Sequence, residues 1–78
     1  MYNTLYVELG KLFRELRHSY NMSQQYVADR LGVTRACYAN WEQGRRIIDF
    51  EMFLKICDVY NADPNEISNK VRKYIYKK

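Results

Sequence analysis

No stretch of the 78-residue chain contains eighteen consecutive apolar residues, so no membrane-spanning helix is expected. The N-terminus also lacks the positively charged start and the cleavage pattern of a secretory signal peptide, and Glu8 and Gly10 interrupt its apolar residues. A cytoplasmic protein is therefore the expectation. The length is typical of one small domain, predicted to span residues 1–78.

Cysteine and histidine are scarce, and Cys37, Cys57 and His18 are the only ones. Two cysteines twenty positions apart, with one distant histidine, match no zinc-binding spacing. Without a secretory signal, reduced thiols are expected rather than a disulfide. We expect both cysteines to be small buried or half-buried side chains, and His18 to lie exposed on the polar face of a helix.

The residue patterns that carry catalysis are also missing. The sequence has no Ser/His/Asp set, no carboxylate pair in a cleft-forming context, no glycine-rich phosphate loop and no cluster of metal ligands. These absences argue against an enzyme, and neither a cofactor nor a metal is expected. The short chain leaves no room for a separate sensor domain, so no small-molecule ligand is expected either.

Charge, by contrast, is plentiful and unevenly distributed. The net charge is +4: residues 1–29 are balanced, residues 30–46 carry +3, residues 47–66 carry −4 and residues 67–78 carry +5. A polyanion would be attracted by the second and fourth of these segments and repelled by the third. The domain is therefore expected to have one side that faces nucleic acid.

Helical periodicity runs through the chain, and no strand pattern is present. In the first helix, for example, the apolar stripe is formed by Leu5, Leu9, Leu12 and Leu16. Side chains that can cap a helix start precede each helical segment: Asn3 or Thr4, Ser23, Thr34, Asp49 and Asp63. The predicted fold is an all-α domain of five helices, over residues 2–20, 24–31, 35–41, 50–60 and 64–76.

The segment from Ser23 to Arg46 predicts two short helices joined by a tight turn. Gly32 ends the first helix, and so short a link to the second forces the sharp crossing of a helix-turn-helix. Tyr38 and Trp41, three positions apart, share the inner face of the second helix. The outer face is left to Arg35, Ala36, Ala39 and Asn40. Such a short face of arginine, alanine and asparagine suits the reading of base edges in a DNA groove.

Four sequence blocks, in this order and spacing, resemble the Xre/Cro-type helix-turn-helix regulators: LGKLFRELR, SQQYVADRLGV, the elbow WEQGRR and LKICDVYNADPNEI. The resemblance covers roughly residues 9–67. The single positions that carry it are Gln24, Ala28, Gly32, Tyr38 and the run Asn40–Arg46. It implies a compact lambda-repressor-like bundle of about five helices, whose motif, about residues 23–42, lays its second helix in the major groove of double-stranded DNA.

The resemblance also implies roles for single residues. Base contacts fall to Arg35, Ala36 and Asn40, and contacts with the DNA backbone fall to Gln24, Thr34, Arg45 and Arg46. Gln24 matches a position that also supports a base-reading residue. Arg17 and Glu42 match a pair that often forms an internal ion pair between the first helix and the motif. For Arg35 and Asn40 the alternative is a phosphate contact or a solvated side chain, and for Arg45 and Arg46 it is an exposed charged loop.

Two positions depart from the pattern of the family. Tyr38 stands where Ile or Val is more common, so its hydroxyl needs a partner in the core, or the side chain leans outward. We count Tyr38 among the predicted contacts with the DNA backbone. Ile48 stands where the elbow usually has proline, which predicts a less rigid loop.

The predicted helix over residues 64–76 has two interpretations. Ile67 and Val71 can close the core, or the helix can extend past the core to a two-fold interface. We favour a homodimer, because pairing two motifs doubles the number of bases read. The predicted interface is Phe53, Tyr60, Val71, Tyr74 and Ile75, with Phe50 and Met52 as further candidates. The predicted function is a sequence-specific transcriptional regulator, a repressor or autoregulator, on a roughly palindromic operator; the alternative is an antitoxin-like or other protein-interaction module that also binds DNA.

Overall fold

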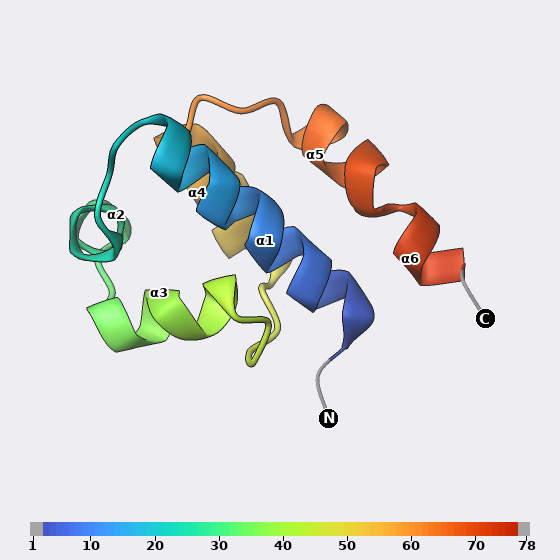
Figure 1. The fold of residues 1–78 in the computed structure, drawn as a ribbon, viewed down its shortest axis with the longest axis horizontal. Helices are drawn as coiled ribbons and strands as arrows, with labels where there is room; N and C mark the ends of the chain where they lie inside the picture. The colour runs from blue at the N-terminus through green and yellow to red at the C-terminus, as the bar shows by residue number, and fades with distance from the viewer. Residues whose placement is uncertain (1–2, 77–78) are drawn as a thin grey trace.

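The computed structural model describes residues 3–76. Tyr2, at the predicted start of the first helix, and Lys77 and Lys78 of the basic tail lie outside the described residues. Within residues 3–76 the secondary structure is entirely helical, as predicted (Figure 1). The helices are α1 (Thr4–Ser19), α2 (Gln24–Leu31), α3 (Arg35–Glu42), α4 (Phe50–Val59), α5 (Pro64–Val71) and the single turn α6 (Lys73–Tyr76).

All five predicted helices are present, and the last one is divided. The segment predicted as one helix over 64–76 is interrupted at Arg72, which separates α5 from α6. The backbone angles of Arg72 stay helical (φ −56°, ψ −36°), so the interruption is local.

Local side-chain chemistry sets the helix starts, as the sequence predicted. The side-chain oxygen of each N-cap accepts a hydrogen bond from a backbone N–H in the first turn, and so satisfies a donor that the helix itself leaves unpaired. Gly32 ends α2 in the left-handed region, with φ 73°, which a residue without Cβ adopts easily. The five N-caps are Asn3, Ser23, Thr34, Asp49 and Asp63.

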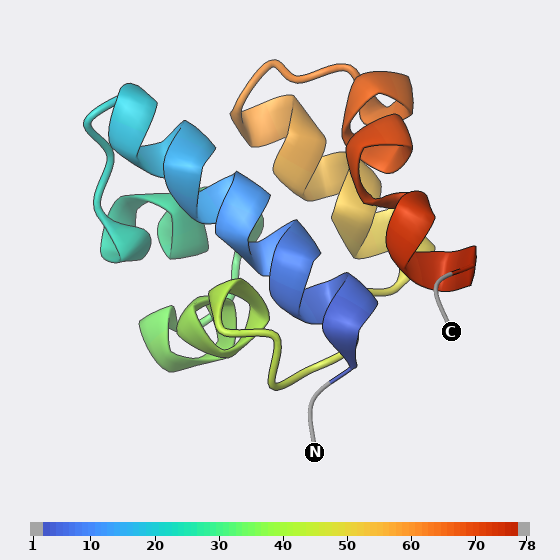
Figure 2. The same ribbon diagram turned by 45° about the vertical axis from the view of Figure 1, so that its right-hand side comes forward.

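The helix α1 lies at the centre of the molecule. It runs diagonally across the fold with α2 and α3 on one side and α5 and α6 on the other, while α4 lies behind it (Figure 1). The turned view in Figure 2 shows α4 and α5 together on the side of α1 away from α3. The helix-turn-helix and the C-terminal helices therefore form opposite sides of the domain.

The core lies where these helices meet. Its largest fully buried side chains are Phe13 of α1, Tyr38 of α3, and Ile56 and Tyr60 at α4 and its C-terminus. Ile48, at the position where the family usually has proline, is also buried, so burial anchors the α3–α4 loop there. The rigidity of this loop stays a prediction. The remaining buried apolar residues are Leu9, Val27, Ala28, Trp41, Cys57, Ile67 and Val71.

Gly10 of α1 allows a close approach to α3 that the sequence did not reveal. A Cβ at this position would lie 2.6 Å from the Trp41 carbonyl oxygen and would also collide with that of Glu42. Contacts this short do not occur between a real Cβ and a backbone oxygen. The glycine therefore lets the backbone of α1 lie directly on the C-terminal end of α3.

None of the helices in the described range combines the length and the apolar character that a membrane span requires. Residues 3–76 also contain no group of three or more His, Cys, Asp and Glu placed to hold a metal ion. The two cysteines and the one histidine lie as expected: Cys57 is buried, Cys37 is partly buried, and His18 is exposed.

Candidate nucleic-acid interface

The helix α3 has an inner and an outer face, divided as the sequence predicted. Tyr38 and Trp41 point into the core. The outer face carries Arg35 and Ala36, which are exposed, and Ala39 and Asn40, which are partly buried. The three predicted base-contacting residues thus lie on the outer face of α3.

The residues predicted to contact the DNA backbone border this face, with the exception of Tyr38. Gln24 is the first residue of α2, and Thr34 is the N-cap of α3. Helix N-termini carry partial positive charge and free N–H groups, which favour phosphate oxygens. Arg45 and Arg46 follow the end of α3 and are exposed, and Arg46 Nη1 lies 3.7 Å from Cys37 Sγ. Cationic and N–H groups therefore lie at both ends of α3.

Tyr38 corrects one prediction. Its side chain is 0% exposed, so it does not lie among the residues available to a DNA backbone. Its hydroxyl hydrogen-bonds instead with the hydroxyl of Tyr60. The partner that the sequence analysis required for this hydroxyl is thus supplied by the end of α4, which allows a large polar residue at an inner position.

Arg17 and Glu42 form the predicted ion pair between α1 and α3. Arg17 Nε donates to Glu42 Oε2 at 2.7 Å, and Arg17 Nη2 donates to Glu42 Oε1 at 3.2 Å. Both residues are buried, and the remaining guanidinium nitrogen, Nη1, donates to the Met22 carbonyl oxygen at 2.9 Å. The pair is bidentate, which is the strong geometry for arginine and carboxylate.

Burial and hydrogen bonding act on the Glu42 carboxylate in opposite directions. Burial by itself raises the pKa of Glu42, but the hydrogen bonds from Arg17 and Gln24, together with the nearby Tyr38 hydroxyl, outweigh it and hold the pKa below its usual value. The same hydrogen bond with Glu42 raises the pKa of Arg17. Both groups are therefore charged at neutral pH.

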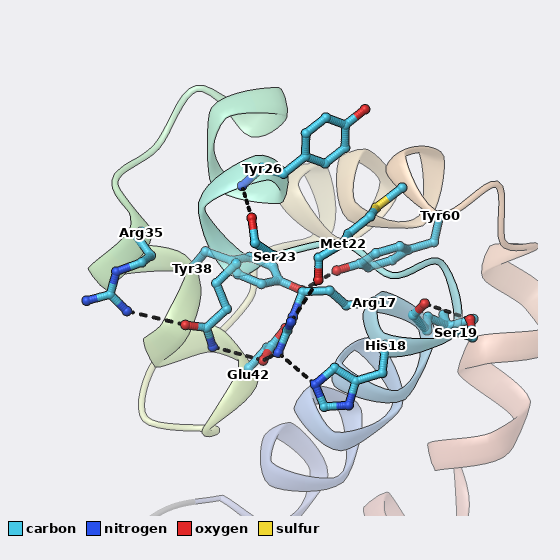
Figure 3. A network of polar contacts seen from close by, with 12 residues as sticks. Arg17, His18, Ser19, Met22, Ser23, Tyr26, Arg35, Tyr38, Glu42 and Tyr60 are labelled. Atoms are coloured by element: carbon cyan, nitrogen blue, oxygen red, sulfur yellow. Dashed lines mark hydrogen bonds and ion pairs between the residues drawn. The ribbon is translucent and has the colours of Figure 1, made fainter.

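The ion pair continues to the outer face through Gln24. Gln24 Nε2 donates to Glu42 Oε1 at 3.1 Å, and Gln24 Oε1 accepts from Arg35 Nη1 at 3.3 Å. Figure 3 shows the resulting network, with Arg35 at one end and Arg17 and His18 at the other. A continuous series of hydrogen bonds thus joins the buried side of the motif to the first outer residue of α3.

The predicted dimer interface is only partly available. Tyr60 is 1% exposed and Val71 is 6% exposed, because both belong to the core of the monomer, so these two predictions are wrong. Phe53 and Tyr74 are partly buried, and Ile75 is 58% exposed. Periodicity placed Tyr60 and Val71 on an apolar face correctly, but it could not tell a face that closes the core from a face left for a partner.

Other apolar side chains are more exposed than the predicted ones. Phe50 is 73% exposed and stacks on Phe53, with 6.5 Å between the ring centroids. Nothing in the sequence sets it apart, because Phe50 follows the same helical spacing as Phe53, Cys57 and Tyr60. Ile47 and Tyr76 are also exposed. Next to Phe50 lies a groove lined by Leu5, Tyr6, Leu9, Ile48, Phe50, Phe53, Ser68, Val71, Arg72 and Ile75.

Comparison with known proteins identifies the class to which this fold and this face belong. A family model described as helix-turn-helix matches residues 13–67, which is more than half of the chain. The chain therefore belongs to the helix-turn-helix family. Within that family it is of the Xre type, as the four sequence blocks predicted.

Individual similar proteins agree with this assignment. The HTH-type transcriptional regulator AnsR of Bacillus subtilis is 32% identical over 59 residues, which are 76% of this chain and 51% of AnsR. The chain spans about half or less of the length of the curated relatives it matches.

Two solved structures are similar in both fold and sequence. The restriction-modification controller protein C.AhdI from Aeromonas hydrophila has a TM-score of 0.74 and 29% identity, and the similarity covers 80% of this chain and 94% of C.AhdI. An XRE-family like protein from Pseudomonas syringae has a TM-score of 0.79 and 27% identity, over 91% of this chain and 87% of that protein.

Proposed function

We propose that this protein regulates transcription by binding specific sequences of double-stranded DNA with the outer face of α3. The observation that carries the proposal is the small polar face of α3, open to solvent at Arg35 and Ala36 and bordered by exposed Arg45 and Arg46. The segment from residue 30 to 46, which carries this face, has a charge of +3. Membership in the Xre-type regulators supports the same proposal.

Three residues of the face have a chemical role in this proposal. Arg35 donates two hydrogen bonds to a guanine, a contact worth about 1–3 kcal/mol of discrimination. Asn40 pairs with an adenine, and Ala36 packs on a thymine methyl group. Contacts with phosphates come from Gln24, Thr34, Arg45 and Arg46 and fix the orientation of α3 without reading the sequence.

The proposal includes a homodimer on a roughly palindromic operator, acting in the cytoplasm as a repressor or autoregulator. A single α3 reads few bases, and two copies related by a two-fold axis would place their recognition helices about 34 Å apart, one turn of DNA. Phe50 and Ile75, both on the groove beside α4, supply exposed apolar surface for such a pairing. The likeness to C.AhdI, a restriction-modification controller protein, supports a regulatory role.

Selection of bound sequences from a random DNA pool tests base reading and symmetry together. On the selected site, Arg35→Ala should lose about 5- to 150-fold of preference at one base pair, while weak non-specific binding survives. Arg30→Ala is the matched control, because Arg30 is also exposed but its guanidinium hydrogen-bonds to Tyr26 within α2. Equally weak binding to every duplex at about 50 mM salt would contradict the proposal.

Sedimentation at micromolar concentration tests the dimer. The wild type should sediment at twice its 9.5 kDa mass, and Phe50→Asp should sediment as a folded monomer, because Phe50 contributes little to the monomer core. Tyr26→Asp, at an exposed aromatic on α2, should leave the dimer intact. A wild-type protein that stays monomeric on its selected operator would exclude the dimer. A promoter–reporter assay then decides between repression and activation.

A further inference from the structure

Gln24 lies between two groups with opposite and fixed hydrogen-bonding character. The ionised Glu42 carboxylate can only accept hydrogen bonds, and the Arg35 guanidinium can only donate them. The Gln24 amide matches both, since its Nε2 donates to Glu42 and its Oε1 accepts from Arg35. A rotation of the amide by half a turn would place donor against donor and acceptor against acceptor.

The position of Glu42 is itself determined by buried contacts. Its carboxylate is held by two hydrogen bonds from Arg17, at 2.7 and 3.2 Å, and the Arg17 guanidinium is also anchored on the Met22 carbonyl. Each buried side-chain nitrogen and oxygen within residues 3–76 has a hydrogen-bond partner. The acceptor that faces Gln24 is thus fixed in both place and charge.

We propose that Glu42 is a positioning residue for base recognition, because it holds the Gln24 amide in the orientation that restrains Arg35. The inference rests on the proposed function of Arg35. Only Arg35 Nη1 is engaged by Gln24, so the guanidinium keeps four of its five N–H groups for a guanine. A restrained arginine loses less side-chain freedom on binding and meets a base in one geometry. The ion pair between Arg17 and Glu42 would then affect base discrimination as well as stability.

The test measures a ratio, the affinity for the selected operator divided by the affinity for the operator changed at the base pair that Arg35 reads. Removal of both charges in the R17M/E42L variant avoids leaving one charge stranded in the core and takes the acceptor away from Gln24. We expect this ratio to fall about tenfold, with non-specific affinity unchanged. A control with an ion pair removed elsewhere, K11M/E8Q on the surface of α1, should keep the wild-type ratio.

Two further variants separate positioning from a general structural role. In an Arg35→Ala background, R17M/E42L should cause no additional loss in the ratio, since the restrained side chain is gone. Gln24→Met removes the hydrogen bonds between Glu42 and Arg35 and leaves the Arg17–Glu42 ion pair intact, so it should lower the ratio as R17M/E42L does. If R17M/E42L does not fold, this variant alone tests the positioning role. Thermal unfolding followed by circular dichroism identifies the folded variants.

The outcomes distinguish this inference from the proposed function. If the wild type shows no preference among duplexes, or if Arg35→Ala keeps the preference, base reading by Arg35 is wrong. If Arg35→Ala loses the preference but Gln24→Met keeps the full ratio, the positioning role of Glu42 is wrong. A loss of equal size for R17M/E42L with and without Arg35 would also overturn it, because the effect would then not pass through Arg35.

Discussion

The two buried hydroxyls of Tyr38 and Tyr60 should have unequal effects on stability. Both side chains lie in the core, and their hydroxyls hydrogen-bond to each other. The Tyr38 hydroxyl also lies near Glu42 and lowers the pKa of that carboxyl. Because an ionised carboxylate only accepts, we expect the Tyr38 hydroxyl to direct its hydrogen toward Glu42 and to accept from Tyr60. On this expectation the three groups form a directed series with Tyr38 at its centre.

Removal of either hydroxyl by substitution with phenylalanine leaves the ring in place. In Tyr60→Phe, the Tyr38 hydroxyl still donates to Glu42, so the loss is one neutral hydrogen bond, about 0.5–1.5 kcal/mol. In Tyr38→Phe, the buried Tyr60 hydroxyl has no acceptor and the charged Glu42 loses a donor. Together these cost about 2–4 kcal/mol. The double variant removes the stranded hydroxyl and should be no less stable than Tyr38→Phe alone.

Urea denaturation at pH 7, followed by circular dichroism, measures these free energies of unfolding. The slope against urea should stay constant across the four proteins, since none of the changes alters the surface exposed on unfolding. The double-mutant cycle then gives the coupling between the two hydroxyls. A Tyr60→Phe variant that loses as much stability as Tyr38→Phe, or a double variant with strictly additive losses, would refute the directed series.

Three further predictions concern single groups. The folded-state pKa of Glu42 lies below its ordinary value of 4.5, so the stability that Glu42 contributes is present above about pH 4.5 and is lost as the pH falls through the folded-state pKa. Thermal melts between pH 7 and pH 3 should show this loss of stability. The R17M/E42L variant should lack this contribution. Gly10→Ala should destabilise the fold by about 1–3 kcal/mol in urea despite the better helix propensity of alanine, because its Cβ collides with α3, and an unchanged midpoint would contradict the close approach. Burial raises the pKa of the Cys57 thiol to about 11, so iodoacetamide at pH 8 should alkylate Cys37 in the native protein and leave Cys57 unmodified, as read by mass spectrometry of the peptides.

The helix starts were predictable because local chemistry determines them. Ser23, Thr34, Asp49 and Asp63 each satisfy a backbone donor two or three residues away, and such an interaction is visible in the sequence itself. Gly10 shows the opposite case. Only glycine fits at this position, because a Cβ would collide with carbonyl oxygens of another helix some thirty positions later in the chain. Nothing around Gly10 in the sequence carries that information.

The division of apolar residues between core and surface was predictable only in part. Periodicity correctly placed Tyr38 and Trp41 inward on α3, because a helix with one polar face has only one face to bury. On α4 and α5, apolar residues occupy more of the circumference, and the sequence does not say which of them other helices cover. Tyr60 and Val71 were covered by the monomer, while Phe50 was left exposed.

Tyr38 shows both what the sequence could predict and what it could not. The sequence showed that an inner tyrosine needs a partner, and it could not show that Tyr60, twenty-two positions later, supplies it. An Ile or Val at position 38 would leave the Tyr60 hydroxyl buried without its hydrogen-bond partner and would remove a hydroxyl that lowers the pKa of Glu42. The departure from the usual family residue is therefore tied to the tyrosine at the end of α4. Glu42 also accepts a hydrogen bond from Gln24, and Gln24 accepts one from Arg35. A substitution in the core at position 38 therefore also affects the hydrogen bonds that lead to the outer face of α3.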